Sequence, residues 1–141
     1  MIVKVKKLNP NAVINNYAKP GDAGIDLTAV SKTEDTLAVT YGTGLAFEIP
    51  EGYVGLIFPR SSVYKQELIL SNCVGVIDSG YRGEVMLKFK RTPGGTVPKQ
   101  YEIGDRIGQI IIMPYPQVTL VEADELSETE RGTGGYGSSG K

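Results

Sequence analysis

The stretch Gly75-Val76-Ile77-Asp78-Ser79-Gly80-Tyr81-Arg82-Gly83 decides the fold that we predict for this chain of 141 residues. An apolar run leads into Asp78, a Ser-Gly pair makes a tight turn, and Tyr81 follows the turn. Residues 84–90 then alternate between apolar and polar side chains, as a half-buried antiparallel strand does. The pattern predicts a β-hairpin with a carboxylate and an aromatic ring at its tip.

Short strand-like segments separated by turns fill most of the remaining chain. Eighteen Gly and eight Pro exceed the usual share and indicate many turns. A short helix is predicted only within residues 59–67, where Ser61 or Ser62 can cap the free amides. We therefore predict an all-β domain over residues 1–123, with strands within residues 2–6, 21–29, 36–40, 44–49, 53–58, 68–70, 84–90, 103–114 and 118–123.

Composition excludes several kinds of site. Fifteen Lys and Arg against sixteen Asp and Glu leave a net charge of −1, so no basic footprint for duplex nucleic acid is present. The single cysteine, Cys73, excludes an intramolecular disulfide, and without histidine a Cys/His zinc site cannot form. Imidazole catalysis is excluded as well, so a carboxylate is the expected proton acceptor.

No apolar run of signal-peptide length follows the first methionine, and no stretch approaches the length of a membrane span. We therefore expect a soluble cytoplasmic protein that binds neither membranes nor nucleic acid.

Several polar residues stand in settings that admit both a structural and a functional interpretation. Asp26 lies between apolar neighbours, on the opposite face of its strand, and taken alone is more typical of an edge or turn aspartate. Arg60 precedes two serines at a helix start, which suits an anion site or a plain N-cap. Asn72 can contact a base edge or close a turn. Arg106 and Gln109 lie in an apolar segment and need partners, either a ligand or another subunit.

The segment 124–141 loses apolar periodicity and is rich in glycine, so we expect a flexible arm. Residues 135–141 match the spacing of a G-x-x-x-x-G-K loop, but the required strand and helix are missing, and we reject a P-loop. Backbone amides with Arg131 and serine hydroxyls nevertheless suit a triphosphate. An inert tail is the alternative, although Arg131 and Tyr136 are unusual in a pure linker.

Taken together and in order, five segments resemble the five motifs of the trimeric dUTP pyrophosphatase (dUTPase) family. They span nearly the whole chain: residues 23–27 (AGIDL), 59–62 (PRSS), 75–83 (GVIDSGYRG), 104–109 (GDRIGQ) and 131–140 (RGTGGYGSSG).

The resemblance implies Mg²⁺-assisted hydrolysis of dUTP to dUMP and pyrophosphate, which would limit uracil incorporation into DNA and supply dUMP for dTMP synthesis. Asp78 would activate a water that attacks the α-phosphorus, and Tyr81 would pack against the deoxyribose. Asp26 would reach Mg²⁺ through a coordinated water. The other implied contacts are Asn72, Val76, Ile77 and Met86 for uracil, Arg60, Ser61, Ser62 and Gln109 for the phosphates, and Arg131, Gly135, Tyr136, Gly137 and Ser138 in an arm that closes over the site.

The resemblance also implies a β-barrel or jelly-roll-like (β-clip) subunit in a homotrimer with shared active sites. Two residues depart from the family pattern. Ser62 stands where glycine is common but still supplies its amide, and Tyr136 stands where phenylalanine is common but keeps a stacking face.

Four other functions are compared with this one. A dCTP deaminase, or a bifunctional deaminase and pyrophosphatase, would need a glutamate where this chain has Lys88. A regulatory nucleotide-binding module without catalysis would have no need of Asp78, whereas a regulatory role in addition to catalysis stays compatible with the sequence. A structural trimeric β-protein would leave Arg131 and Tyr136 unexplained.

Overall fold

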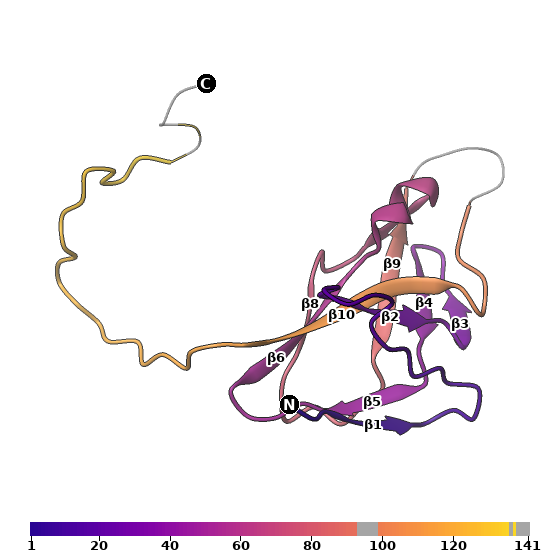
Figure 1. Ribbon diagram of the computed structural model, residues 1–141. Coiled ribbons are helices and arrows are strands. Elements are labelled where there is room, and N and C mark those ends of the chain that lie inside the picture. The colour runs from indigo at the N-terminus through magenta and orange to yellow at the C-terminus, as the bar shows by residue number, and fades with distance from the viewer. Residues whose placement is uncertain (93–98, 136, 138–141) are drawn as a thin grey trace.

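The computed structural model describes residues 1–92, 99–135 and 137, and the part it describes is built almost entirely of strands (Figure 1). The all-β prediction is therefore confirmed. In chain order the elements are β1 (Lys4–Lys7), β2 (Ile25–Thr28), β3 (Ser31–Glu34), β4 (Ala38–Gly42), β5 (Leu45–Glu48), β6 (Tyr53–Phe58), the 3₁₀ helix η1 (Ser61–Lys65), β7 (Leu68–Leu70), β8 (Gly75–Ile77), β9 (Met86–Arg91) and β10 (Arg106–Pro114).

The strands form three antiparallel sheets around one core. Two sheets have four strands each, in the orders β2-β10-β6-β8 and β3-β4-β9-β7, and β1 pairs with β5 in a third. The alternation of residues 84–90 predicts one buried face, and this is confirmed, because its apolar side chains Val85, Leu87 and Phe89 are buried. They pack with apolar side chains from the other four-stranded sheet, such as Leu27, Ile107 and Ile110. The core thus joins the two large sheets.

The predicted β-hairpin at residues 75–90 is wrong. β8 pairs with β6 in one sheet, whereas β9 pairs with β4 and β7 in the other. Between β8 and β9, Val85 donates its N–H to the carbonyl of Leu45, the first residue of β5. The chain has therefore left β8 and its sheet before β9 begins. Alternation of apolar residues determines which face of a strand is buried, but it does not determine the neighbouring strand. The Asp78–Tyr81 turn therefore connects two sheets.

The structure differs from the predicted strands in two places between residues 31 and 42. β3 lies where the sequence predicts no strand, because its sequence, SKTE, has no apolar side chain to alternate. β4 begins at Ala38 rather than Thr36, since the Asp35 carboxylate accepts the N–H groups of Leu37 and Ala38 and holds that segment in a turn.

Two further predictions differ from the structure. Residues 118–123 form no strand: Leu120 is 92% exposed, and within the described residues no strand pairs with this segment. The predicted helix is the 3₁₀ helix η1, whose N-cap is Arg60 without any capping side chain, so neither Ser61 nor Ser62 caps it. Among the described residues no helix is long and apolar enough to cross a membrane.

An aromatic cluster fills the core of the β3-β4-β9-β7 sheet. The Tyr41 ring meets the rings of Phe89 and Tyr101 edge-on, with centroids 5.9 and 6.0 Å away. The Tyr41 hydroxyl donates a hydrogen bond to the Tyr101 carbonyl at 2.9 Å. Burial raises the pKa of Tyr41 to about 12, and burial also raises the pKa of Tyr101. Both phenols are thus held neutral in the folded chain.

Raising the pH above 10 should lower the free energy of unfolding. The unfolded chain loses the Tyr41 proton near pH 10, whereas the folded chain keeps it to about 12. The contribution of the neutral Tyr41 hydroxyl to the free energy of unfolding is complete below pH 10. It is lost as the pH rises toward 12, by up to about 1.4 kcal/mol per pH unit. Urea denaturation at pH 9, 10 and 11 measures this slope. Tyr41→Phe should flatten it, while Tyr64→Phe, at a side chain 79% exposed, should not. Equal slopes for all three proteins would contradict the assignment.

Candidate functional site

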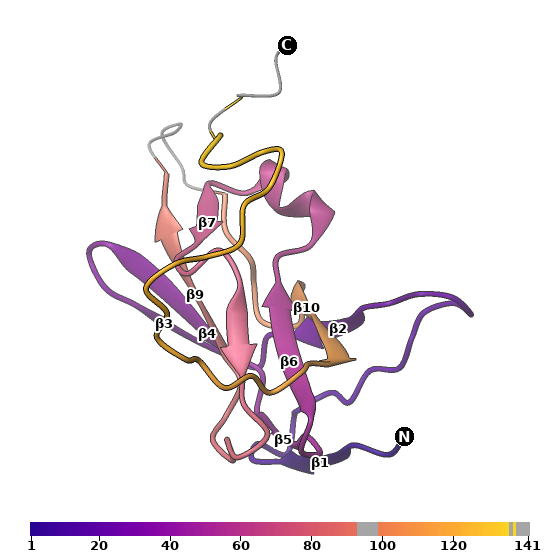
Figure 2. The ribbon, with the colours of Figure 1, turned by 90° about the vertical axis from the view of Figure 1, so that its left-hand side faces the viewer.

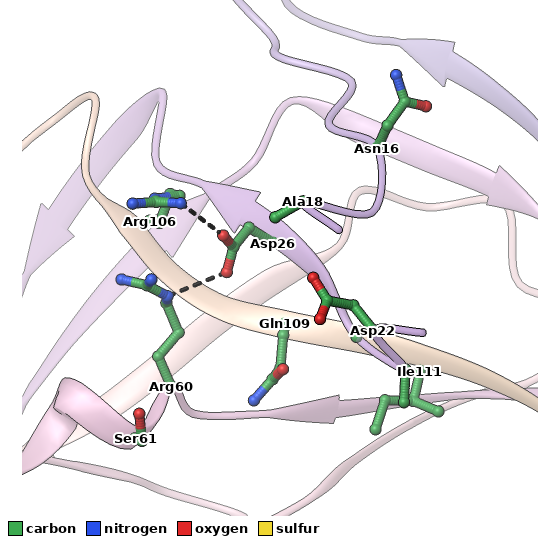
Figure 3. A pocket seen from close by; sticks show the side chains of 11 residues that line it. Asn16, Ala18, Asp22, Asp26, Arg60, Ser61, Arg106, Gln109 and Ile111 are labelled. Atoms are coloured by element: carbon green, nitrogen blue, oxygen red, sulfur yellow. Dashed lines mark hydrogen bonds and ion pairs between the residues drawn. The ribbon is translucent and has the colours of Figure 1, made fainter. Parts of the chain in front are cut away.

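A cleft of about 400 Å³ opens at the β2 edge of the β2-β10-β6-β8 sheet, next to the start of η1 (Figure 3). It gathers four of the predicted site residues from three separate segments of the chain: Asp26, Arg60, Ser61 and Gln109. They meet because Asp26 of β2 lies opposite Gln109 of β10, which in turn lies opposite Phe58 at the end of β6. We call this the phosphate cleft, after the ligand group predicted for these residues.

The Asp26 carboxylate is held between two arginines in the phosphate cleft. Oδ1 lies 3.0 Å from Nε of Arg60, and Oδ2 accepts a hydrogen bond from Nη1 of Arg106 at 2.9 Å (Figure 3). Only 22% of the Asp26 side chain is exposed. Asp22 also lines the cleft, so its lining carries two guanidinium groups and two carboxylates. An anion would therefore be held here by directed donors more than by net charge.

Arg106 and Gln109 find their partners within the same chain. Gln109 donates through Nε2 to the Pro59 carbonyl at 3.2 Å, which ties β10 to the segment before η1. Arg106 pairs with Asp26. The pairing was not evident from the sequence, since the two residues are 80 positions apart.

Ser62 does not line the phosphate cleft. It lines an adjoining hollow of about 280 Å³ together with Arg60 and Arg106. Arg60 and Arg106 line both hollows, whereas Ser61 lines only the phosphate cleft and Ser62 only the adjoining hollow.

A second cleft, of about 190 Å³, lies at the opposite edge of the same sheet. It brings together five predicted site residues from β8, the turn that follows it and the start of β9: Val76, Ile77, Asp78, Tyr81 and Met86. We call it the nucleoside cleft, after the group predicted for these residues.

The turn in the nucleoside cleft is closed by the Tyr81 N–H, which donates to the Asp78 carbonyl at 3.1 Å. The Asp78 side chain is exposed and, within the described part of the chain, makes no hydrogen bond or ion pair. Its carboxylate can therefore accept a proton from water, with an aromatic ring close by.

Two other side chains differ in their relation to the nucleoside cleft. Asn72 lies exposed in the turn before β8, where its carbonyl accepts the Val74 N–H at 2.6 Å, and it lines neither cleft. Glu84 lines the nucleoside cleft, although it is not among the site residues predicted from the sequence. Its Oε1 accepts the Gly44 N–H at 2.7 Å, a contact across 40 positions that no local pattern indicates.

The two clefts are well separated on one chain. Asp26 and Ile77 lie on the two edge strands of the sheet, three strand spacings apart. Gln109, the partner of Asp26, pairs with Phe58 on β6, whereas Ile77 pairs with Gly55. With about 4.8 Å per strand and about 3.3 Å per residue, Asp26 and Ile77 are roughly 17 Å apart. Asp78 follows Ile77 in the direction away from Phe58.

The C-terminal segment leaves β10 and stands apart from the strands (Figures 1 and 2). Its hydrogen bonds between residues 129 and 134 are local: Arg131 Nε donates to the Gly134 carbonyl at 2.9 Å, and the Gly132 N–H donates to the Thr129 carbonyl at 3.0 Å. Gly135 and Gly137 are exposed, while the predicted contacts Tyr136 and Ser138 lie outside the described residues. The segment makes no hydrogen bond to either cleft of its own chain, as far as it is described.

The donor groups suit a magnesium ion that arrives with a phosphate ligand. Within residues 1–92 and 99–135 no cluster of three or more Asp, Glu or Cys side chains is placed to hold a metal. Mg²⁺ keeps several waters and binds phosphate oxygens with one or two carboxylates. Both Asp26 oxygens already face arginines, so contact through a coordinated water fits this site.

Comparison with known proteins gives a consistent result. Residues 10–140 match the family model for dUTPase. A deoxyuridine 5'-triphosphate nucleotidohydrolase of Nautilia profundicola is 41% identical over 147 residues, covering 100% of both chains. Among solved structures, the Staphylococcus bacteriophage 80alpha dUTPase with dUPNHPP has a TM-score of 0.83 and 30% identity, covering 99% of each chain. A dUTPase from phage phi11 of S. aureus, described with a structural Mg(II) ion, has a TM-score of 0.73 and 26% identity over 89% of this chain and 98% of that one.

Proposed function

The chain belongs to the dUTPase family, and we propose that it hydrolyses dUTP to dUMP and pyrophosphate by attack of an Asp78-activated water on the α-phosphorus. The observation that carries this proposal is the nucleoside cleft, where an unpaired carboxylate stands beside a tyrosine ring. The activity would limit uracil incorporation into DNA and supply dUMP for dTMP synthesis.

Phosphoryl transfer depends mainly on positioning and on stabilisation of charge. Asp78 would orient the water and take its proton, and Tyr81 would pack against the deoxyribose. Val76 and Ile77, on the exposed edge of β8, would offer their backbone to uracil together with Asn72, and Met86 would line the same pocket. Uracil is thereby bound on one edge of the sheet.

The phosphates would bind on the other edge. Arg60, Ser61, Ser62 and Gln109 supply donors there, and Asp26 would hold Mg²⁺ through a coordinated water. When bound with the triphosphate, the ion neutralises the charge that develops on the phosphate oxygens. The phosphate cleft is suited to a magnesium–triphosphate complex because its two arginines and two aspartates balance each other in charge.

The separation of the clefts supports active sites shared between subunits, which the homotrimer that we propose from the family would provide. A span of roughly 17 Å between the edge strands is too long for Asp26 and Asp78 of one chain to serve the same α-phosphate. We propose that the nucleoside cleft of one subunit faces the phosphate cleft of another. Residues 1–123 would form the subunit body, and residues 124–141 would close over a neighbour's site with Arg131, Gly135, Tyr136, Gly137 and Ser138.

A nucleotide panel tests the proposed function. The purified protein with Mg²⁺ should release pyrophosphate from dUTP and far less from dCTP, dTTP or UTP, and removal of the ion with a chelator should suppress the reaction. Pyrophosphate and ammonia are measured in parallel. Release of ammonia from dCTP without pyrophosphate would show a deaminase instead.

Gly24→Ala should weaken substrate binding through Gln109. A methyl group at Gly24 would lie 2.3 Å from Oε1 and 3.1 Å from Cδ of Gln109, so that side chain must turn away. We expect KM for dUTP to rise about tenfold, the value of one hydrogen bond to a charged group, with little change in melting temperature. Steady-state kinetics of Gly24→Ala, Gln109→Ala and the double variant form a cycle. Fully additive effects would mean that Gly24 acts independently of Gln109.

A further inference from the structure

We infer that Gly83 and Glu84 form a seat that fixes the Tyr81 ring and thereby sets the discrimination between deoxyribose and ribose nucleotides. This inference rests on the proposed function, in which the ring packs against the sugar. Neither residue is among the predicted substrate contacts. Their part is to position Tyr81, whose side chain is 42% exposed and would otherwise have several rotamers open to it.

The Tyr81 ring lies directly on Gly83. A methyl group at position 83 would come within 2.4 Å of the Tyr81 Oη, 2.5 Å of Cζ and 2.9 Å of Cε2. These distances are shorter than any van der Waals contact, so the ring in its present place requires glycine there. Gly83 has no left-handed φ, so space for the ring, and not backbone conformation, is what demands the missing side chain.

Hydrogen bonds hold both ends of Tyr81. Its hydroxyl donates to the Glu84 carbonyl at 3.0 Å, and its N–H donates to the Asp78 carbonyl at 3.1 Å. The guanidinium of Arg82 donates to the carbonyls of Ser79 and Tyr81 and so braces the turn between these two points. The residue is therefore fixed at its backbone and at the tip of its ring.

Glu84 is itself anchored to the turn between β4 and β5. Its Oε1 accepts the Gly44 N–H at 2.7 Å, and it occupies the space beside Gly42, where a methyl group would lie 2.4 Å from that oxygen. Next to it the buried Thr43 hydroxyl donates to the Val85 carbonyl at 2.7 Å. The Glu84 carboxylate is thus committed to the scaffold, and the carbonyl that receives the Tyr81 hydroxyl belongs to a rigid segment.

This rigidity matters because a ribose differs from a deoxyribose by one hydroxyl group. A ring that could move by about 1 Å would make room for that oxygen, whereas selective sites hold their groups within about 0.5 Å. The connected contacts from the β4–β5 turn through Glu84 to Tyr81 provide this constraint. The pairing of β4 with β9 thus determines the position of a wall in the nucleoside cleft.

Gly83→Ala tests the inference, with Gly80→Ala as its matched control. A methyl group at Gly80 meets no atom within 4 Å, and Gly80 has no left-handed φ. The readout is the ratio of kcat/KM for dUTP to kcat/KM for UTP. We expect Gly83→Ala to lower this ratio at least about tenfold, the scale of discrimination at a small steric difference, and Gly80→Ala to preserve it.

Glu84 supplies a second, independent pair of variants. Glu84→Ala removes the acceptor for the Gly44 N–H and should lower the ratio, whereas Glu84→Gln keeps an acceptor oxygen and should restore it. If Gly83→Ala does not fold, the two Glu84 variants test the inference without it. If the wild-type protein is selective and the ratio of kcat/KM values for dUTP and UTP is unchanged in Gly83→Ala or in Glu84→Ala, the role of Gly83 and Glu84 in positioning Tyr81 is excluded. The proposed function would be unaffected by that result. Failure of the wild-type protein to hydrolyse dUTP would overturn the proposed function, and the inference with it.

Discussion

Asp78→Asn should strongly reduce turnover while leaving nucleotide binding nearly intact. Asparagine has the size of aspartate but cannot take a proton from water, so we expect kcat to fall by about 10²- to 10⁴-fold. The turn should survive, because its closing hydrogen bond uses the Asp78 carbonyl and not the side chain. Pyrophosphate release measures kcat, and calorimetric titration with a non-hydrolysable dUTP analogue measures the dissociation constant.

A surface acid provides the control for Asp78→Asn. Glu51 is exposed in the turn between β5 and β6, and Glu51→Gln removes the same charge away from both clefts. It should keep wild-type turnover. Normal hydrolysis by Asp78→Asn would exclude Asp78 as the base, and an equally large loss in Glu84→Gln would point to the second carboxylate of the nucleoside cleft instead.

The fold was predictable wherever burial leaves a local pattern. Alternation in residues 84–90 placed Val85, Leu87 and Phe89 in the core, because side chains of a strand point alternately to its two faces. The polar strand β3 left no such pattern. The partners of β9 could not be predicted either, since an alternating segment pairs with any neighbour of matching polarity, and β4 and β7 rather than β8 lie beside it.

The residues of the candidate site were easier to predict than their arrangement. Asp26, Arg60 and Gln109 belong to three motifs, and pairing of β2, β10 and β6 brings them into one cleft. The sequence indicated that Arg106 needed a partner, but that partner is Asp26, far away in the chain. No sequence pattern indicated a role for Glu84, because that role depends on the Gly44 N–H and on the absence of side chains at Gly42 and Gly83.

Deletion of residues 131–141 should reduce kcat/KM for dUTP by about 100-fold without changing the fold. The expected loss corresponds to the charge-assisted hydrogen bonds that Arg131 and the arm amides would give to the phosphates, about 1.5 to 3 kcal/mol for one such bond. The fold should persist because Arg131 and Gly134 bond to each other and not to the strands. Steady-state kinetics measure the loss, and thermal melting measures stability.

Arg131→Ala separates the guanidinium from the rest of the arm. It should account for about tenfold of the loss, since one charge-assisted bond is removed while the glycine amides remain. Glu130→Gln, at an exposed neighbour that carries the opposite charge, should not reproduce it. A truncated protein that melts far below the full-length chain would identify the arm as part of the subunit's structure. In a mixed trimer of truncated subunits and subunits carrying Asp78→Asn, activity above that of either parent would be expected if the arm serves a neighbour. A site closed by its own subunit's arm would give no such recovery, because neither kind of subunit could then supply both the base and the arm.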